Sequence, residues 1–127
     1  MASKNRKLSP LPLQPTDWPT LVRPGSRVFL SSYAAVPLAL ADSLLTQYRE
    51  LIDVELVHLL TLGDSPWSDE KYHGHLNANS LYIGPGIQPA LAAGRADYTP
   101  AYAFEIPSLF RQRILALDIA LVQVSPP

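Results

Sequence analysis

Residues 27–62 read RVFLSSYAAVPLALADSLLTQYRELIDVELVHLLTL and follow the pattern strand, helix, strand. A β-rich run at 27–31 leads into a loop of small residues, and Pro37 then favours the first turn of a helix. A second apolar run at 54–62 is partly β-branched. This order demands a parallel pair of strands joined by a right-handed crossover, so we expect an α/β fold.

The helix predicted between these strands has one apolar face, because its apolar residues recur every three or four positions. We expect its buried stripe to consist of Leu38, Ala41, Leu44, Leu45, Tyr48, Leu51 and Ile52. Asp42, Gln47, Arg49 and Glu50 fall mostly outside that stripe.

The flanking sequence predicts two units. Residues 1–22 form an N-terminal arm with about one turn of helix, capped by Thr16 or Asp17, and residues 23–127 form the α/β domain. Within this domain we expect a surface loop at 67–79, a strand at 80–83, a turn at 84–86, a helix at 87–93 ended by Gly94, a turn holding Asp97 and Tyr98, a helix at 107–113 and a strand at 118–124. The last strand is almost continuously apolar, which predicts burial on both faces in the centre of a parallel sheet.

Composition excludes several classes of protein. The chain has 127 residues, 47 % of them hydrophobic, and a net charge of −1, which gives no electrostatic reason to bind nucleic acid or an anionic membrane. It has no cysteine, which excludes thiolate nucleophiles and cysteine-based metal sites. No apolar run approaches the about 18 residues of a membrane span, and no signal-peptide pattern is present. We therefore expect a cytoplasmic protein that binds neither nucleic acid nor membrane.

The loop after the first strand is the first candidate site. Ligands of open α/β sheets bind outside the carboxyl ends of the strands, and the N–H groups that begin a helix attract an anion or a developing oxyanion. The alternative is an ordinary turn packed on its neighbours. Since the last strand ends at the same edge of the sheet, the candidate pocket residues are Ser31, Ser32, Ala34, Ala35, Pro37, Ser125 and Pro126.

Histidines and carboxylates offer further chemistry. His73 and His75 lie in a loop near carboxylates, but no ligand framework surrounds them, so we expect a solvated loop and no metal site. His58 lies in an apolar strand and is predicted to be a satisfied core histidine rather than a base. Asp97 and Glu105 suit either substrate orientation and general acid–base work or, equally, the capping of a helix. The chain has no G-x-S-x-G elbow, P-loop or G-x-G-x-x-G motif.

Several motifs resemble those of the acetyl-CoA hydrolase/transferase family, which includes acetate and 4-hydroxybutyrate CoA-transferases. They are GRADYTP at 94–100, EIP at 105–107 and LDIALVQVSPP at 117–127, with further agreement at 25–29, 34–37 and 82–86. This chain also departs from the family pattern. The family's loop after the first strand resembles a glycine, serine, glycine run, and Ser31 and Tyr33 occupy its glycine positions. Gln88 replaces a frequent arginine, and Phe104 replaces a common serine. The resemblance covers about residues 23–127. It implies a parallel-sheet α/β domain of the NagB/RpiA/CoA-transferase-like fold, of which this chain is the N-terminal half only, ending after the last strand.

The resemblance also implies a function. Family members exchange CoA between an acyl-CoA and a small carboxylic acid, or water, through a glutamyl-CoA intermediate. The glutamate that forms it lies in the second half of the family pattern, so we expect no catalytic residue in this chain and no activity of the chain alone. CoA is expected as a substrate rather than a tightly bound cofactor, and the partner is the C-terminal half or a second copy. The alternative is a non-catalytic α/β remnant that works by association with a partner chain.

Overall fold

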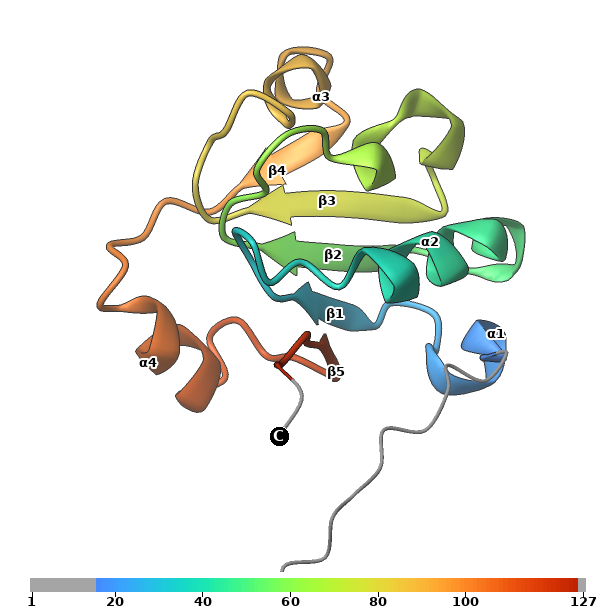
Figure 1. Ribbon diagram of the computed structural model, residues 1–127, viewed down its shortest axis with the longest axis horizontal. Helices are drawn as coiled ribbons and strands as arrows, with labels where there is room; N and C mark the ends of the chain where they lie inside the picture. The colour runs from blue at the N-terminus through green and yellow to red at the C-terminus, as the bar shows by residue number, and fades with distance from the viewer. Residues whose placement is uncertain (1–15, 126–127) are drawn as a thin grey trace, which may run out of the picture.

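A computed structural model describes residues 16–125 as one parallel sheet with helices packed on it (Figure 1). The five strands have the order β4-β3-β2-β1-β5, and each pairs with its neighbours in parallel. The parallel α/β fold is therefore confirmed. Because the strands share one direction, their carboxyl ends form one edge, at the left of Figure 1. The strands are β1 Arg27–Leu30, β2 Val54–His58, β3 Leu76–Ser80, β4 Ala96–Tyr98 and β5 Ile119–Leu121.

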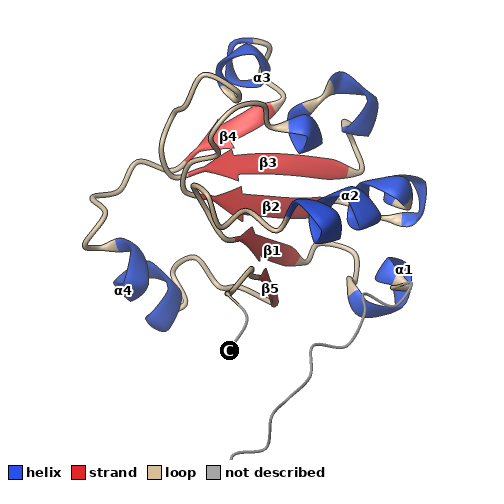
Figure 2. Cartoon of the chain, in the orientation of Figure 1, coloured by secondary structure: helices blue, strands red, loops and turns tan. Residues whose placement is uncertain are grey.

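Residues 16–125 contain four short α-helices and three turns of 3₁₀ helix (Figure 2); the first α-helix precedes β1 and the others lie between strands. The α-helices are α1 Trp18–Leu21, α2 Leu38–Thr46, α3 Gln88–Ala92 and α4 Ile106–Arg111, and the 3₁₀ turns are Tyr48–Glu50, Pro66–Ser68 and Glu70–Tyr72. The single turn of helix predicted after Asp17, the short helix closed by Gly94 and the helix near 107–113 are confirmed. No helix in residues 16–125 is long and apolar enough to cross a membrane. The cytoplasmic location stays a prediction from composition.

The helix between β1 and β2 is shorter than its apolar pattern predicts. Helix α2 ends at Thr46, and a 3₁₀ turn follows. Because a 3₁₀ turn has three residues rather than 3.6, the spacing no longer keeps side chains on one face. Ala41, Leu44, Leu45 and Leu51 are buried as expected, but Leu38 is 56 % exposed and Ile52 is 60 % exposed. The prediction of burial was wrong for these two residues, which lie at the ends of the segment.

One face of the sheet carries the main core. Val28, Leu30, Val54 and Leu56 of the two central strands pack there, and Leu76, Ala78 and Leu121 extend that surface across the sheet. Helix α2 covers this face with Leu44 and Leu45, and it crosses in front of the strands in Figure 1. Trp18 of α1 joins the same core, and its indole N–H donates to Ser43 Oγ at 3.0 Å. The short helix that precedes the turn at 23–26 therefore packs with the α/β domain.

The opposite face of the sheet has a smaller apolar cluster. Phe29 and Val57 contact α4 and the segment after it, where Ile106 and Leu115 are buried. The Phe29 and Phe110 rings meet edge to face with centroids 5.5 Å apart. Helix α4 is the α-helix that contributes to this cluster in the part of the chain that the structure describes.

Strand β3 corrects the prediction for the middle of the chain. The predicted loop at 67–79 and strand at 80–83 were both wrong, because β3 occupies Leu76–Ser80 and Trp67 and Tyr72 before it are buried. The strand was missed because it contains Asn77 and Asn79, and asparagine is rare in strands. Their amides instead donate to Asp53 Oδ1 at 2.9 Å and to Glu55 Oε1 at 3.0 Å, so both polar groups are satisfied on the sheet.

The two edge strands correct two more predictions. Asp97 and Tyr98 belong to β4 rather than to a turn, because β4 pairs with β3. Strand β5 is an edge strand, not a central one, since it pairs with β1 alone among the described residues. Val122 and Val124 beyond it are 54 % and 81 % exposed. The apolar pattern of this segment is therefore not matched by burial within this chain.

Candidate functional site at the carboxyl edge of the sheet

Three loops pack against each other where β1, β2 and β3 end. Tyr33 forms an isolated bridge with Thr61, and Asp64 forms another with Gly86. A Cβ atom on Gly86 would overlap the carbonyl oxygen of Gly63 and lie 3.0 Å from the Ser65 nitrogen. Only glycine allows this approach of two backbones, so the loops after β2 and β3 form one packed unit at the edge.

The serine hydroxyls predicted to line a pocket hold the first loop in place. Ser31 Oγ donates to the carbonyl oxygen of Ala35, and it accepts from the Gln123 N–H at 3.4 Å. Ser32 Oγ accepts from the Leu59 N–H at 2.9 Å. The structure thus brings the loop after β1 together with the segment that follows β5 and leads to Ser125. Pro126 lies outside the described residues, as do residues 1–15 of the predicted arm.

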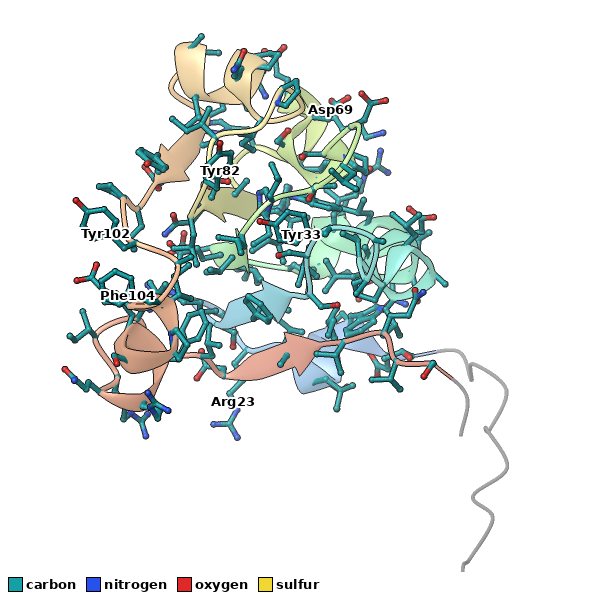
Figure 3. All side chains as sticks on the ribbon, turned by 60° about the vertical axis from the view of Figure 1, so that its left-hand side comes forward. Arg23, Tyr33, Asp69, Tyr82, Tyr102 and Phe104 are labelled. Atoms are coloured by element: carbon teal, nitrogen blue, oxygen red, sulfur yellow. The ribbon has the colours of Figure 1, made fainter. Side chains whose placement is uncertain are left out.

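The small residues of the same loop are open to solvent. Ala34 and Ala35 are exposed, and Pro37 is buried at the position before α2 begins at Leu38. Tyr33 has a φ of +56°, the left-handed region that glycine adopts without strain, and its side chain is 50 % exposed (Figure 3). The loop engages part of its backbone internally, because the Tyr33 N–H donates to the Leu60 carbonyl oxygen at 2.8 Å and the Ala35 N–H donates to that of Ser32 at 3.1 Å. A ligand at Ala34 and Ala35 stays a prediction.

Exposed aromatic side chains gather at this edge, a feature that sequence reasoning missed. Among the described residues, the large aromatic side chains that are exposed follow β1, follow β3, or lie at and after the end of β4. They are Tyr33, Tyr82, Tyr98, Tyr102 and Phe104. Their positions in the sequence could have indicated their exposure, because each aromatic residue lies at the end of a strand or in the segment after one.

The segment after β4 forms a hollow of about 320 Å³. It is lined by Tyr98, Pro100, Ala101, Tyr102 and Glu105. The Tyr102 and Phe104 rings stack with centroids 5.7 Å apart and planes 12° from parallel, and both side chains lie at the outer edge of the molecule in Figure 3. Glu105 Oε2 accepts from the Tyr102 backbone N–H at 3.2 Å. Glu105 stands at the N-cap of α4, but its side chain makes no hydrogen bond to that helix, so the predicted role of a helix cap was wrong.

His58 ends β2 directly beneath this edge. The residue is 2 % exposed, and burial lowers the pKa of its imidazole to about 4, so the ring is neutral near pH 7. The core position was predicted correctly, but only one ring nitrogen has a partner: Nδ1 lies 3.3 Å from Thr61 Oγ1. Among residues 16–125, His58 Nε2 and Trp67 Nε1 are buried without a hydrogen-bond partner, and the two rings meet edge to face at 5.5 Å.

The histidine loop before β3 has structural contacts instead of a ligand framework. His75 Nδ1 lies 2.9 Å from the carbonyl oxygen of Leu51, and its ring packs edge to face on Tyr48 at 5.4 Å. In the described part of the chain, no three His, Cys, Asp or Glu side chains gather in a way that suits a metal ion.

Comparison with known protein families shows to which family this chain belongs. The model of the acetyl-CoA hydrolase/transferase N-terminal domain matches residues 13–127, which is nearly the whole chain. This chain belongs to the acetyl-CoA hydrolase/transferase family. The resemblance read from the GRADYTP, EIP and LDIALVQVSPP motifs is thereby confirmed.

Two family relatives are similar in sequence over most of this chain. The 4-hydroxybutyrate coenzyme A transferase of Clostridium kluyveri is 36 % identical over 102 residues, 80 % of this chain and 24 % of that protein. A succinyl-CoA:acetate/propanoyl-CoA:succinate CoA transferase of Fasciola hepatica is 39 % identical over 108 residues, 84 % of this chain and 22 % of that protein. This chain therefore spans about a quarter of the length of these relatives.

A solved structure supports the fold. The crystal structure of RipA from Yersinia pestis aligns with a TM-score of 0.74 over 87 % of this chain and 28 % of that one, at 15 % identity. At this level of identity the likeness concerns the course of the backbone, and it agrees with the parallel sheet seen here.

Proposed function

We propose that this chain is the N-terminal part of an enzyme that exchanges CoA between an acyl-CoA and a small carboxylic acid or water. The observation that carries the proposal is the family match across residues 13–127, together with relatives that are named as CoA transferases. Because the chain spans about a quarter of those relatives, most of their residues have no counterpart here. We place the catalytic glutamate among those residues and expect no activity of this chain alone.

The reaction that we propose for the complete enzyme proceeds by covalent catalysis. A glutamate carboxylate attacks the thioester carbonyl, the C–S bond breaks, and an acyl-glutamyl anhydride and the CoA thiolate form. The thiolate then attacks the glutamyl carbonyl, which releases the acyl group as a carboxylate and leaves a glutamyl-CoA thioester. An acceptor carboxylate then attacks this thioester, which forms a second glutamyl anhydride and expels the CoA thiolate. The thiolate attacks the acceptor's carbonyl in that anhydride, which gives the new acyl-CoA and frees the glutamate carboxylate. In a hydrolase, water attacks the thioester instead and releases CoA and the glutamate carboxylate. Such a path divides one difficult step into easier ones.

In this proposal the present chain supplies one wall of the acyl-CoA site. Each attack on a carbonyl develops negative charge on its oxygen, and fixed N–H donors stabilise that charge. The Tyr33 and Ala35 N–H groups already donate to the carbonyl oxygens of Leu60 and Ser32. The donors that we propose are therefore the N–H groups of Ser32 and Ala34, between which Tyr33 adopts its left-handed conformation. The hydroxyls of Ser31 and Ser32, which are engaged within the loop and its neighbours, fix its shape.

The proposed partner is the C-terminal half or a second copy of the chain. Parallel sheets are normally covered on both faces, and here α4 is the α-helix on the second face among the described residues. The exposed Val122 and Val124 beside edge strand β5 add apolar surface for the same partner. This surface also suits the alternative function, in which the chain acts by association without catalysis.

A chimera tests the two functions. Residues 23–127 replace the matching segment of the Clostridium kluyveri relative, and CoA transfer from acetyl-CoA to an acceptor acid is measured. We expect the chimera to transfer CoA, the free chain to release none at an enzyme-like rate, and Ala35→Asp in the chimera to lower kcat/KM by at least tenfold, because its carboxylate opposes the developing oxyanion. Ala93→Asp, at an exposed position after α3, is the matched control. A folded but inactive chimera would favour the association function, and turnover by the free chain would contradict our placement of the glutamate.

A further inference from the structure

We propose that the hollow after β4 binds a planar purine ring, and that this ring is the adenine of CoA. The identity of the nucleotide rests on the proposed function, whereas the ring site itself rests on the geometry of residues 98–105. The hollow lies at the carboxyl end of β4, the edge at which parallel sheets bind their ligands.

The aromatic side chains of this segment suit a stacked ring. Tyr102 is 72 % exposed and Phe104 is 79 % exposed, yet their rings already stand nearly parallel. Covering the outer face of such a stacked pair removes apolar surface from water and so lowers the free energy, and a nucleobase is flat enough to stack there. The neighbouring hollow of about 320 Å³ falls at the lower end of the sizes typical of small-molecule sites.

The charge in the hollow favours a base over an acid. The charged side chain among its lining residues is the carboxylate of Glu105, of which Oε2 accepts one backbone N–H. A carboxylate accepts hydrogen bonds and has none to donate, so it pairs with the exocyclic amine of adenine. The same charge repels the anionic acceptor acid of the proposed reaction and the phosphates of CoA. We therefore place the ring in this hollow and the anionic groups outside it.

The ring site is tested by titrating the free chain with adenosine, purine riboside, pantetheine and acetate. The readout is the shift of the backbone NMR signals of residues 98–105. We expect adenosine to bind there in a saturable way and pantetheine and acetate to leave these signals unchanged. Adenosine should bind at least fivefold more tightly than purine riboside, which lacks the exocyclic amine, and Glu105→Gln should reduce that preference.

Matched variants separate stacking from a change in fold. Tyr102→Ala should weaken adenosine binding about tenfold, in the range that base stacking gives. Tyr102→Phe keeps the ring and should bind within about twofold of the parent. Tyr82→Ala removes another exposed tyrosine of the same edge, outside this hollow, and should leave adenosine binding unchanged.

The outcomes distinguish this proposal from the proposed function. If adenosine fails to bind while the chimera transfers CoA, the ring site is wrong and the enzyme function stands. Saturable adenosine binding that Tyr102→Ala weakens about tenfold, in a chain whose chimera is folded but inactive, supports the ring site and contradicts the CoA-transfer function. Binding of acetate in place of adenosine would overturn the assignment of the hollow.

Discussion

Polar side chains that are linked by hydrogen bonds cross the second face of the sheet. Thr99 Oγ1 donates to Asn79 Oδ1 at 2.9 Å, and Asn79 Nδ2 donates to Glu55 Oε1 at 3.0 Å. Arg27 donates through Nε to Glu55 Oε2 and through Nη1 to the carbonyl oxygen of Ala116 at 3.1 Å. Glu55 therefore joins three strands, because its two oxygens bind side chains from β1 and β3.

Removal of this central carboxylate should destabilise the fold. We expect Glu55→Ala to lower the free energy of unfolding by about 1–3 kcal/mol, since it leaves the Arg27 Nε–H and the buried Asn79 amide without their acceptor. Urea denaturation at pH 7 measures the change. Glu50→Ala, at an exposed position of the 3₁₀ turn after α2, should change stability by less than about 0.5 kcal/mol. Equal effects of the two substitutions would contradict this role of Glu55.

His58 gives stability a defined dependence on pH. The unfolded chain binds a proton near the usual histidine pKa of 6.5, whereas burial lowers the pKa in the folded chain to about 4. Protons therefore favour the unfolded state between these values, and stability falls by about 3 kcal/mol as the pH drops from 7 to 4. Urea denaturation across this range should show a shallower decline in His58→Leu. An unchanged pH dependence in that variant would show that another group causes it.

At the level of secondary structure, the sequence predicted those elements that nearby residues determine, through helix-starting and helix-ending residues and apolar spacing. Pro37, the spacing of Ala41, Leu44 and Leu45, and Gly94 were enough for the positions of α2 and α3. Strand β3 was missed because two of its residues are asparagines whose amides find partners on the neighbouring strand, a tertiary contact that no local pattern reports.

The site was predictable to a similar extent. The rule for ligand sites in open sheets predicts a site at the carboxyl edge, and the loop at 31–37 lies at that edge. The hydrogen bonds of Ser31 and Ser32 within and beyond the loop could not be predicted from the sequence. The exposed aromatic residues after β4 were overlooked, because aromatic residues are ordinarily assigned to the core.

Because the loops pack closely at this edge, we expect one added methyl group to lower the free energy of unfolding clearly. Gly86→Ala should lower the free energy of unfolding by about 1–3 kcal/mol, because the new Cβ overlaps the Gly63 carbonyl oxygen and neither backbone can yield easily. Thermal unfolding followed by circular dichroism measures it. Ala93→Ser, at an exposed position, is the control and should be close to neutral. A neutral Gly86→Ala would mean that the two loops are less tightly joined than described.

At the scale of the whole molecule, the arrangement of the sheet explains the error in placing β5. A continuous apolar pattern indicates that a strand is buried in the complete protein. The pattern is the same whether the residues that cover the strand belong to this chain or to another polypeptide. In residues 16–125, β5 pairs with β1 alone, and the neighbouring Val122 and Val124 are exposed. The pattern and the structure agree if another polypeptide covers this edge.

Hydrogen exchange tests whether β5 is completed by further polypeptide. In the free chain we expect the β5 amides that do not face β1 to exchange rapidly, because nothing among the described residues accepts their hydrogens. In the chimera those amides should become protected by at least tenfold, while the amides of central strand β2 change little. Identical exchange in both proteins would show that the partner binds elsewhere.

The edge-to-face contact between His58 and Trp67 gives the chain an internal optical reporter. Both tryptophans, Trp18 and Trp67, are almost fully buried, so their emission is sensitive to loss of the native core. A charged imidazole beside an indole quenches the fluorescence of the indole, whereas a neutral imidazole quenches it far less. Emission from Trp67 should therefore dim as the imidazole gains its proton, and protonation of a single interior side chain can be followed without any attached dye.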